Sequence, residues 1–484
     1  MFIQDILSRL QPLRLRGKQD GKIGGIAFDS RSVKPGDLFV AVPGTQVDGH
    51  NYISQALQNG AVAVICEKMP DNLKEGVSWI QVKDSSKALA LAASAYYDDP
   101  SRKIRLAGVT GTNGKTTVVT LLYQLFKALG FKTGMISTIK MLVDEDQTDA
   151  HLTTPDVLTI NRYLKEMVDA GCSYAFMEVS SHAIQQNRVY GLDFDLAMFS
   201  NITHDHLDYH KTFAEYVKAK KRFFDELPVT ASVLVNLDDR NGSLMVQNTK
   251  AAKYGYALKK AADFKAKVLE NSFEGLQLDI NGRQVWSGLV GDFNACNLLL
   301  VYGAARLLGQ KEEDVLVKLS LLRPAVGRFE VLRSVGGKTA IVDYAHTPDA
   351  LENVVKTISS VKSNAQKLII VIGAGGDRDK TKRPLMGKIA ANFAEKVIFT
   401  SDNPRGEDPA QIIEDMKTEL PEEAYGALLE ITDRKQAIYT ACMLATNNDI
   451  VLVAGKGHET YQEVKGVRHH FDDKEIIRSV FKQQ

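Results

Sequence analysis

The sequence is poor in cysteine and has no long uninterrupted hydrophobic run. Its four cysteines lie far apart and form no CxxC pair, so neither a disulfide framework nor a thiolate zinc site is indicated. The N-terminal stretch mixes charges into its apolar positions, unlike a signal peptide, and no later segment is long enough to span a bilayer. We therefore expect a cytoplasmic protein with no membrane insertion.

The chain also lacks an excess of charge of either sign. Its 60 Lys and Arg residues balance 59 Asp and Glu residues, which gives a formal net charge of +1. No basic stretch is interleaved with aromatic residues, so we expect no binding to nucleic acid. The 484 residues, 44% hydrophobic and 25% charged, are typical of a folded protein and too many for a single core.

The most informative stretch covers residues 106–122, LAGVTGTNGKTTVVTLL, where an apolar run meets a glycine-rich turn and then a helical apolar pattern. The glycines let several backbone N–H groups point at one anion, and Lys115 adds a positive charge. Thr116 can place its hydroxyl on a magnesium ion at the helix N-terminus. Val109 stands where the general phosphate-loop pattern has glycine, so this loop is a variant. An ordinary glycine turn is the alternative, but the pattern favours nucleotide binding.

Apolar strand patterns alternate with helical patterns along the chain, which predicts an α/β protein of three domains. We expect a small α/β domain over residues 1–100, a domain with a mostly parallel sheet over 101–330, and a doubly wound domain over 331–484. In such sheets, ligands gather at the carboxyl ends of the strands. The expected strands are GDLFVAV, GAVAVICE, VSWIQV, YAFMEVSS, LAMFSNI, ASVLVNLDD, TAIVDYAH, KLIIVIGAGGDRD, KVIFTSDNPRGEDP and DIVLVAGKGHE.

Polar residues follow several of these strands. The apolar run of YAFMEVSS ends at Glu178, which is well placed to bind magnesium beside a phosphate loop; a helix-capping role for Glu-Val-Ser-Ser is the alternative. The His-x-His-x-Asp-x-His spacing of residues 204–210 nearly copies the zinc cluster of metallo-β-lactamase-like hydrolases. Tyr209 breaks that pattern, and a dinuclear zinc enzyme would leave the glycine-rich loop unexplained. In a magnesium site, His206 would join carboxylate ligands.

Charged residues in the second half of the chain suggest a further site. Residues 216–224 form an amphipathic helical pattern, whose lysines would normally be a solvated face. Arg378 and Arg405 follow strands of the last segment and could hold carboxylates, and Glu459 could receive an ammonium group. Solvent-exposed surface arginines are the alternative. Together these residues predict a site for a zwitterionic substrate.

Taken together, the motifs resemble those of the Mur ligase family, the ATP-dependent amide-bond ligases that build the peptide stem of peptidoglycan. The resemblance covers essentially the whole chain, and the family's own loop is GTNGKT, which accounts for Val109. It implies an N-terminal α/β uridine-nucleotide domain, a central P-loop ATPase-like domain with a parallel sheet, and a C-terminal Rossmann-like doubly wound domain. The matching motifs are DSRSVKPGDLFVAVPG, GTNGKTT, MEVSSHAIQQNRV, SNITHDHLDYH, YVKAKKRFF, GDFNACN, GRFE, VDYAHTPDAL, GAGGDRDKTKRPLM and AGKGHE.

The resemblance also implies the site residues. The Mg2+ ligands would be Thr116, Glu178, His206 and a carbamylated Lys220. The carbamate supplies oxygen ligands, which the lysine amine cannot. Glu178, His206 and Lys220 would form the catalytic centre together with Lys115. The residues that would bind ATP are Gly111, Thr112, Asn113, Gly114, Lys115, Thr116, Thr117, Asn294, Arg328 and Asp343. Those that would bind UDP-MurNAc-dipeptide are Ser30, Thr45, Gln46, Val47, Thr153, Thr154, Ser180, Gln186 and Arg188. Those that would bind diaminopimelate are Arg378, Asp402, Asn403, Pro404, Arg405, Gly455 and Glu459.

The implied reaction joins meso-diaminopimelate to UDP-MurNAc-L-Ala-D-Glu through an acyl phosphate formed by ATP. The DNPR stretch at 402–405 resembles the diaminopimelate-adding members of the family, and Arg405 is a natural partner for the second carboxylate that lysine lacks. The alternatives are a lysine-adding ligase of the same family, a folylpolyglutamate synthetase and a non-catalytic ATP-binding module. We expect a monomer that acts on small molecules alone.

Overall fold

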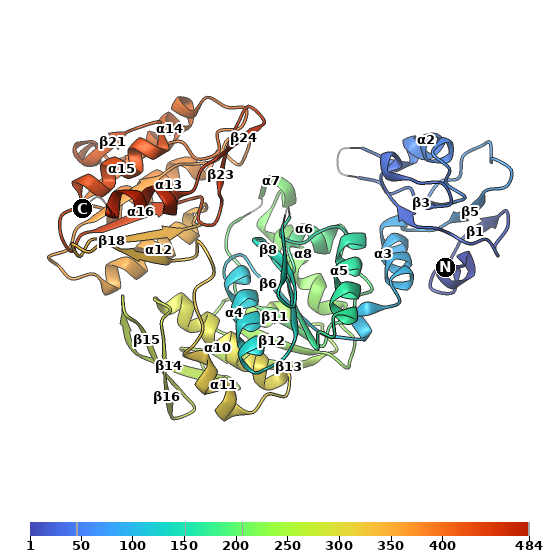
Figure 1. Ribbon diagram of the computed structural model, residues 1–484, viewed down its shortest axis with the longest axis horizontal. Helices are drawn as coiled ribbons and strands as arrows, with labels where there is room; N and C mark the ends of the chain where they lie inside the picture. Colours follow the sequence, from blue (N-terminus) through green and yellow to red (C-terminus); the bar gives the residue numbers. More distant parts are fainter. Residues whose placement is uncertain (45–46, 151, 206, 483–484) are drawn as a thin grey trace.

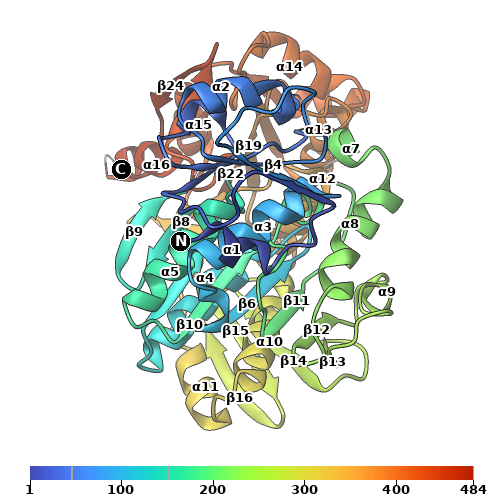
Figure 2. The same cartoon turned by 90° about the vertical axis from the view of Figure 1, so that its right-hand side faces the viewer.

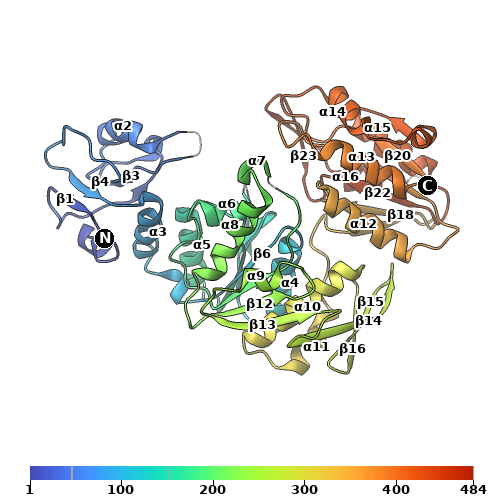
Figure 3. The same cartoon turned by 180° about the vertical axis from the view of Figure 1, so that it is seen from behind.

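The computed structural model describes residues 1–44, 47–150, 152–205 and 207–482. The chain forms three bodies, each built around its own β-sheet, which follow one another along an arc (Figure 1). The first and last bodies lie on either side of the middle one, as the view from behind also shows (Figure 3). Within the described ranges, no helix is long and apolar enough to cross a membrane.

The first body is a five-stranded sheet with the order β1-β5-β4-β3-β2, in which only the β1 edge is antiparallel. Side chains alternate between the faces of a strand. Leu38 and Val40 therefore pack into one apolar cluster and Phe39 into another, so both faces of the sheet are covered. The elements are α1 (Ile3–Leu7), β1 (Arg14–Arg16), β2 (Ile26–Ala27), β3 (Leu38–Val40), α2 (Ile53–Gln58), β4 (Ala63–Cys66), β5 (Ser78–Gln81) and α3 (Ser85–Tyr96).

The middle body contains an eleven-stranded sheet with the order β16-β15-β14-β13-β12-β11-β6-β10-β7-β8-β9. Its centre is parallel, and both ends finish in antiparallel strands. The strands are β6 (Arg105–Thr110), β7 (Thr133–Ile136), β8 (Lys140–Val143), β9 (Asp146–Asp149), β10 (Tyr174–Glu178), β11 (Leu196–Phe199), β12 (Ser232–Asn236), β13 (Ala252–Ala257), β14 (Phe264–Ser272), β15 (Gly275–Ile280) and β16 (Arg283–Ser287). Figure 2, in which the first body faces the viewer, shows the β14–β16 end at the bottom of the molecule.

Helices cover both faces of this middle sheet. Apolar residues of α4, α10 and α11 pack on one face, and those of α5 and α8 pack on the other. The helices are α4 (Lys115–Ala128), α5 (Val157–Asp169), α6 (Ser181–Gln185), α7 (Leu207–His210), α8 (Phe213–Asp225), α9 (Gly242–Met245), α10 (Asp292–Leu307) and α11 (Glu312–Leu319). Because β6 lies between β10 and β11, the loop from β6 to α4 emerges at the carboxyl edge of the parallel strands, where ligands bind in such sheets.

The last body is a six-stranded sheet with the order β17-β18-β22-β19-β20-β21, antiparallel only at β17. Helices α12, α13 and α14 pack on one face, and α15 and α16 pack on the other, which makes it doubly wound. A separate hairpin, β23 with β24, stands beside it. The elements are β17 (Glu330–Arg333), β18 (Thr339–Asp343), α12 (Pro348–Val361), β19 (Leu368–Ile372), α13 (Lys382–Phe393), β20 (Lys396–Phe399), α14 (Pro409–Lys417), β21 (Leu428–Glu430), α15 (Arg434–Leu444), β22 (Ile450–Ala454), β23 (Tyr461–Val464), β24 (Val467–His470) and α16 (Asp473–Phe481).

All ten expected strands form, and the expected α/β class is confirmed. The antiparallel additions β8, β9, β14–β16 and the β23–β24 hairpin were not among the expected strands. Every residue of β9 and β24 is exposed, so neither strand carries the alternating apolar pattern of a half-buried strand.

Candidate functional site

The loop between β6 and α4 is held in a curled conformation by its neighbours. A Cβ atom at Gly111 would lie 2.0 Å from the Ser200 hydroxyl, so only glycine fits there. The backbone N–H of Asn113 donates to the Asn201 side chain at 2.9 Å, and the Asn201 amide donates back to the Asn113 carbonyl at 3.0 Å. Lys115 Nζ donates to the carbonyls of Gly111 (2.9 Å) and Thr112 (2.8 Å). Burial lowers the pKa of Lys115, although Glu178 opposes the shift.

Glu178 occupies the end of β10, beside this loop. Its Oε1 accepts hydrogen bonds from the Thr116 hydroxyl (2.9 Å) and the Thr138 backbone N–H (2.7 Å). The residue is 0% exposed, and no described residue donates a hydrogen bond to its Oε2. The Glu-Val-Ser-Ser stretch does cap a helix, but through Ser180, whose hydroxyl accepts from Ala183 N–H at the start of α6. A buried carboxylate oxygen without a donor suits a cation.

Lys220 departs from the expectation of a solvated lysine face on α8. Lys218 is exposed, as that expectation requires, but Lys220 is 1% exposed and donates to the Gly111 carbonyl at 2.8 Å. Burial, together with the nearby Lys115, brings the pKa of Lys220 well below its ordinary value. A lowered pKa favours the neutral, nucleophilic form of the amine over the charged form that a solvated lysine keeps. Periodicity could not single out this residue, because the buried and exposed lysines of α8 share one sequence pattern.

His204 and His210 lie in different surroundings. The His204 ring stacks on Phe213 with centroids 4.8 Å apart, and buried His210 places Nε2 2.9 Å from the Ser181 hydroxyl. His206 lies outside the described residues. In the part of the chain that the structure describes, no three His, Cys, Asp or Glu side chains are grouped to hold a metal ion.

Three further residues predicted to contact nucleotide lie in or near the same region. Arg328 donates to the Thr116 hydroxyl at 3.2 Å and lies 4.5 Å from the Tyr344 ring centroid. Asp343 is buried and accepts a 2.6 Å hydrogen bond from Phe329 N–H; burial raises its pKa to about 6. Asn294 is buried in the first turn of α10, and its amide donates to the carbonyl of Val290, just before the helix, at 2.8 Å.

A cavity of about 520 Å³ brings the phosphate loop and the last body together. Its lining includes Glu178, Arg328 and most of the residues predicted for the amino acid. The latter are Arg378, Asp402, Asn403, Arg405, Gly455 and Glu459, and the loop residues are Thr112, Asn113, Gly114, Lys115, Thr116 and Thr117. Pro404 is buried and does not line the cavity. Its carbonyl oxygen packs against Gly376, where a Cβ atom would lie only 1.9 Å from it. Thr153 also lines this cavity.

The amino-acid side of this cavity is a hydrogen-bonded network of loops after β19, β20 and β22. Arg405 adopts a left-handed backbone with φ of 51°, and its guanidinium donates to the Gly376 carbonyl at 2.7 Å. The Asn403 amide donates to Glu459 Oε2 at 2.8 Å. Arg378 is exposed at the cavity edge. Two guanidinium groups and two carboxylates thus share one wall, as a zwitterionic ligand requires.

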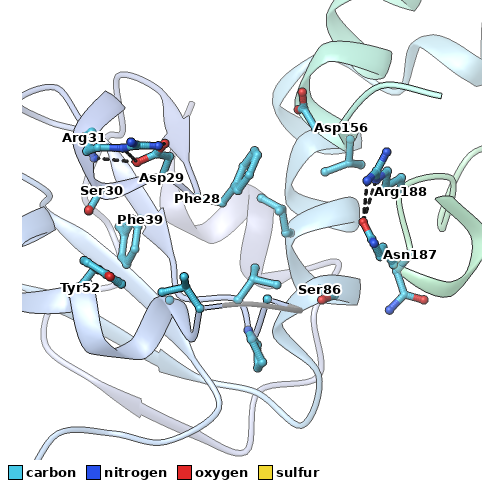
Figure 4. Close-up of a pocket in the computed structure, with 18 of the residues that line it drawn as sticks. Phe28, Asp29, Ser30, Arg31, Phe39, Tyr52, Ser86, Asp156, Asn187 and Arg188 are labelled. Atoms are coloured by element: carbon cyan, nitrogen blue, oxygen red, sulfur yellow. Dashed lines mark hydrogen bonds and ion pairs between the residues drawn. The ribbon is translucent and has the colours of Figure 1, made fainter. Parts of the chain in front are cut away.

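A second cavity, of about 1080 Å³, lies between the first and middle bodies (Figure 4). In the close-up, Ser30 and Arg31 of the first body stand opposite Asn187 and Arg188 of the middle body. Arg188 donates to the Thr154 carbonyl at 2.7 Å and to Gln186 Oε1 at 2.6 Å. The predicted substrate residues in its lining are Ser30, Val47, Gln186 and Arg188.

The other residues predicted for that substrate lie elsewhere. Thr154 is buried; its hydroxyl donates to the Glu178 carbonyl at 2.8 Å and accepts from Ser180 N–H at 3.0 Å. Neither Thr154 nor Ser180 belongs to the lining of either cavity described above, and their proposed roles stay predictions. Thr45 and Gln46 lie outside the described residues.

Sequence reasoning missed a contact between the phosphate loop and the last body. Asp349, in the first turn of α12, accepts hydrogen bonds from the Asn113 amide (2.7 Å) and the Thr203 hydroxyl (3.0 Å). His346 lines the phosphate-loop cavity, and burial lowers its pKa to about 4. The stretch His-Thr-Pro-Asp does signal a helix start, since Thr347 caps α12, but nothing in it reveals a partner 236 residues away.

Comparison with known families gives three matches along the chain. Residues 22–97 match a model described as the Mur ligase family, catalytic domain. Residues 109–305 match the Mur ligase middle domain, and residues 327–457 match the Mur ligase, glutamate ligase domain. The matches follow the order of the three sheets.

Individual relatives match over nearly the full length. UDP-N-acetylmuramoyl-L-alanyl-D-glutamate–2,6-diaminopimelate ligase of Bacteroides fragilis is 54% identical over 481 residues, which cover 99% of each chain. The ligase of the same name from Parabacteroides distasonis is 54% identical over 484 residues, covering 100% of both. A solved structure of a ligase with this name is 34% identical, covers 100% of this chain and 99% of its own, and superimposes with a TM-score of 0.69.

Proposed function

Because the chain belongs to the Mur ligase family, we propose that it is the ATP-dependent ligase that joins meso-2,6-diaminopimelate to UDP-MurNAc-L-Ala-D-Glu in peptidoglycan synthesis. One observation carries the proposal. A single cavity of about 520 Å³ is lined on one side by the phosphate loop and on the other by Arg405 and Glu459. A phosphoryl group and an amino acid can therefore meet in it.

ATP is assigned to the phosphate loop. Lys115, which contacts loop carbonyls in the protein alone, is free to turn to phosphate oxygens, and α4 begins at this point with its positive dipole end. Arg328 adds a second cation beside Thr116. The UDP-MurNAc-dipeptide is assigned to the cavity of about 1080 Å³ between the first and middle bodies, which has room for a large nucleotide sugar.

Diaminopimelate is assigned to the loops of the last body. Arg405 lines the cavity with a guanidinium that already donates to a backbone carbonyl, so its position is set before a ligand arrives. A planar guanidinium pairs with a carboxylate through two hydrogen bonds, and diaminopimelate has a second carboxylate where lysine has none. Glu459 and Asp402 supply the opposite charge for an ammonium group.

Mg2+ would be held by Thr116, Glu178 and a carbamylated Lys220, together with His206. The partnerless, buried Glu178 Oε2 supports this assignment, because hard cations take carboxylate oxygens. The lowered pKa of Lys220 supports carbamylation, in which the neutral amine adds to CO2 and releases a proton. When bound, the ion would neutralise phosphate charge.

The reaction proceeds in two steps on this arrangement. An oxygen of the D-glutamyl γ-carboxylate attacks the γ-phosphorus of ATP, which gives an acyl phosphate and ADP. The diaminopimelate amine then attacks the acyl carbon, an amide bond forms, phosphate leaves and the nitrogen loses a proton. Lys115, the loop N–H groups and Arg328 stabilise the charge on the transferred group, and the last body orients the amine.

We also propose three domains over residues 1–100, 101–330 and 331–484, with one catalytic centre between the second and third. The protein would act as a cytoplasmic monomer on small-molecule substrates.

The test is ATP-dependent phosphate release with UDP-MurNAc-L-Ala-D-Glu and either meso-diaminopimelate or L-lysine. We expect turnover with diaminopimelate alone, and Arg405→Ala should lower kcat/KM for it about a hundredfold, because a carboxylate loses its partner. Arg283→Ala, an exposed arginine on β16, is the control and should change nothing. Equal turnover with lysine would overturn the amino-acid assignment but keep the ligase. No turnover with either amino acid would favour the non-catalytic ATP-binding module.

A further inference from the structure

A fully buried lysine lies beneath the amino-acid side of the cavity. Lys456 is 0% exposed and does not itself line the cavity, whereas Gly455 and Glu459, close to it in the sequence, do. Its Nζ donates to Asn403 Oδ1 at 3.0 Å and to Glu459 Oε2 at 3.1 Å. A buried ammonium is unfavourable unless it is paired, so these two contacts account for its place in the fold.

The glycines on either side aim this lysine inward. Gly455 has φ of 110° and Gly457 has φ of 53°, both in the region that favours glycine. A Cβ atom at Gly455 would lie 2.6 Å from Asp402 Oδ2, and one at Gly457 would lie 2.6 Å from the Gly327 carbonyl oxygen. The Gly-Lys-Gly sequence therefore lets the backbone pass close to the cavity wall while the lysine side chain turns into the interior.

The contacts of Lys456 fix the orientation of two cavity residues. Asn403 Oδ1 accepts from Lys456 Nζ and from Glu463 N–H at 2.9 Å, which leaves the Asn403 NH2 group to donate to Glu459 Oε2 at 2.8 Å. Among the described residues, the hydrogen bonds to the Glu459 side chain both end on Oε2. Glu459 Oε1 is thereby left to a ligand.

We infer that Lys456 is a positioning residue for the amino-acid substrate, which acts by holding Glu459 Oε2 and the Asn403 amide so that Glu459 Oε1 receives the substrate's ammonium group. The inference rests on the proposed function, because it takes the ligand of this wall to be a zwitterionic amino acid. Lys456 touches no substrate in this role. Without it, the Glu459 carboxylate would lose its cationic partner and its fixed direction.

Steady-state kinetics of the full-length protein test this role. Lys456→Met should raise KM for meso-diaminopimelate about tenfold or more, because one member of a buried ion pair is left alone, while KM for ATP and for the nucleotide dipeptide stays within about twofold. Lys417→Met is the matched control. Lys417 is likewise held by ion pairs, with the carboxylates of Glu414 (2.7 Å) and Glu430 (2.8 Å), but it lies outside the cavity lining. It should leave all three KM values unchanged.

A double-mutant comparison separates positioning from general support of the fold. In a Glu459→Gln background, adding Lys456→Met should change KM for diaminopimelate by less than about threefold, because the carboxylate that Lys456 holds is gone. The same rise in both backgrounds, or an equal rise in all three KM values, would overturn the inference.

Should Lys456→Met fail to fold, Lys456→Gln keeps a donor without the charge. It should raise the same KM about threefold or more, and an unchanged KM would overturn the inference. If the wild-type protein shows no turnover with diaminopimelate, the proposed function itself is overturned.

Discussion

The two cavities differ in how they use charge. The cavity between the first and middle bodies is lined by apolar and aromatic side chains, such as Phe28, Phe39 and Leu152, and by a similar number of polar ones, most of which are uncharged. The cavity between the middle and last bodies is lined by ionisable groups that include Lys115 and Glu178. The first is built to bind a large molecule by contact area, and the second to manage charge that moves during a reaction.

The two cavities nevertheless share a wall. Leu152 and Asp156 line the first cavity, Thr153 lines the second, and buried Thr154 lies between them. The Thr154 carbonyl accepts from Arg188 of the first cavity, and its hydroxyl donates to the Glu178 carbonyl of the second. The two cavities are therefore adjacent along the five-residue segment 152–156, so variants on each side test whether binding and chemistry are separable.

The largest effect is expected at Glu178, because its buried oxygen faces the phosphate chemistry without a donor. Glu178→Gln keeps an oxygen for Thr116 and Thr138 but removes the negative charge. We expect kcat to fall about a thousandfold with little change in the melting temperature. Phosphate release and thermal unfolding measure the two quantities. A kcat within about tenfold of wild type would show that this carboxylate is structural.

A smaller and different effect is expected at Arg188. Arg188→Met removes the guanidinium that joins Thr154 and Gln186 at the wall of the first cavity. KM for the nucleotide dipeptide should rise about tenfold, with kcat and KM for ATP within about twofold, because a binding contact is lost and no charge near the phosphate loop changes. Arg162→Met serves as the control, since Arg162 pairs with Glu166 on the exposed side of α5. A parallel fall in kcat would mean that the shared wall couples the two cavities.

How far the sequence predicted these sites depends on the kind of contact. Local sequence patterns predict the phosphate loop, the succession of strands along the chain and the strand-end residues Arg405 and Glu459. The structure brings the loop and these two residues to one cavity. The burial of Lys220 and the Asp349 contact with Asn113 could not be found, because each depends on chain segments more than 100 residues apart. Lys456 was equally hidden, since an inward lysine and a solvated one look alike in a glycine-rich loop.

The last effect concerns stability rather than kinetics, at Asp343 behind the phosphate-loop cavity. Burial raises the pKa of Asp343 to about 6, above its ordinary value of 3.8, even though Arg328 opposes the shift. The folded protein therefore binds a proton more tightly than the unfolded chain, so this group makes the protein less stable as pH rises from about 4 to about 6. At about 1.4 kcal/mol per pKa unit, ionised Asp343 costs about 3 kcal/mol at neutral pH.

Asp343→Asn keeps an oxygen for Phe329 N–H and removes that cost. The variant should unfold at a higher temperature than wild type at pH 7.5 and show no such gain at pH 4.5, while its activity falls because Arg328 loses a carboxylate nearby. Asp449→Asn is the control, because the pKa of Asp449 is shifted in the opposite direction. Burial alone would raise this pKa, but hydrogen bonds from Thr446 and from Lys367 N–H outweigh burial and lower it. That variant should be less stable than wild type at pH 7.5. If Asp343→Asn instead lowers the stability at both pH values, the carboxylate stabilises the fold. The negative charge behind the second cavity would then contribute to the stability of the protein instead of reducing it.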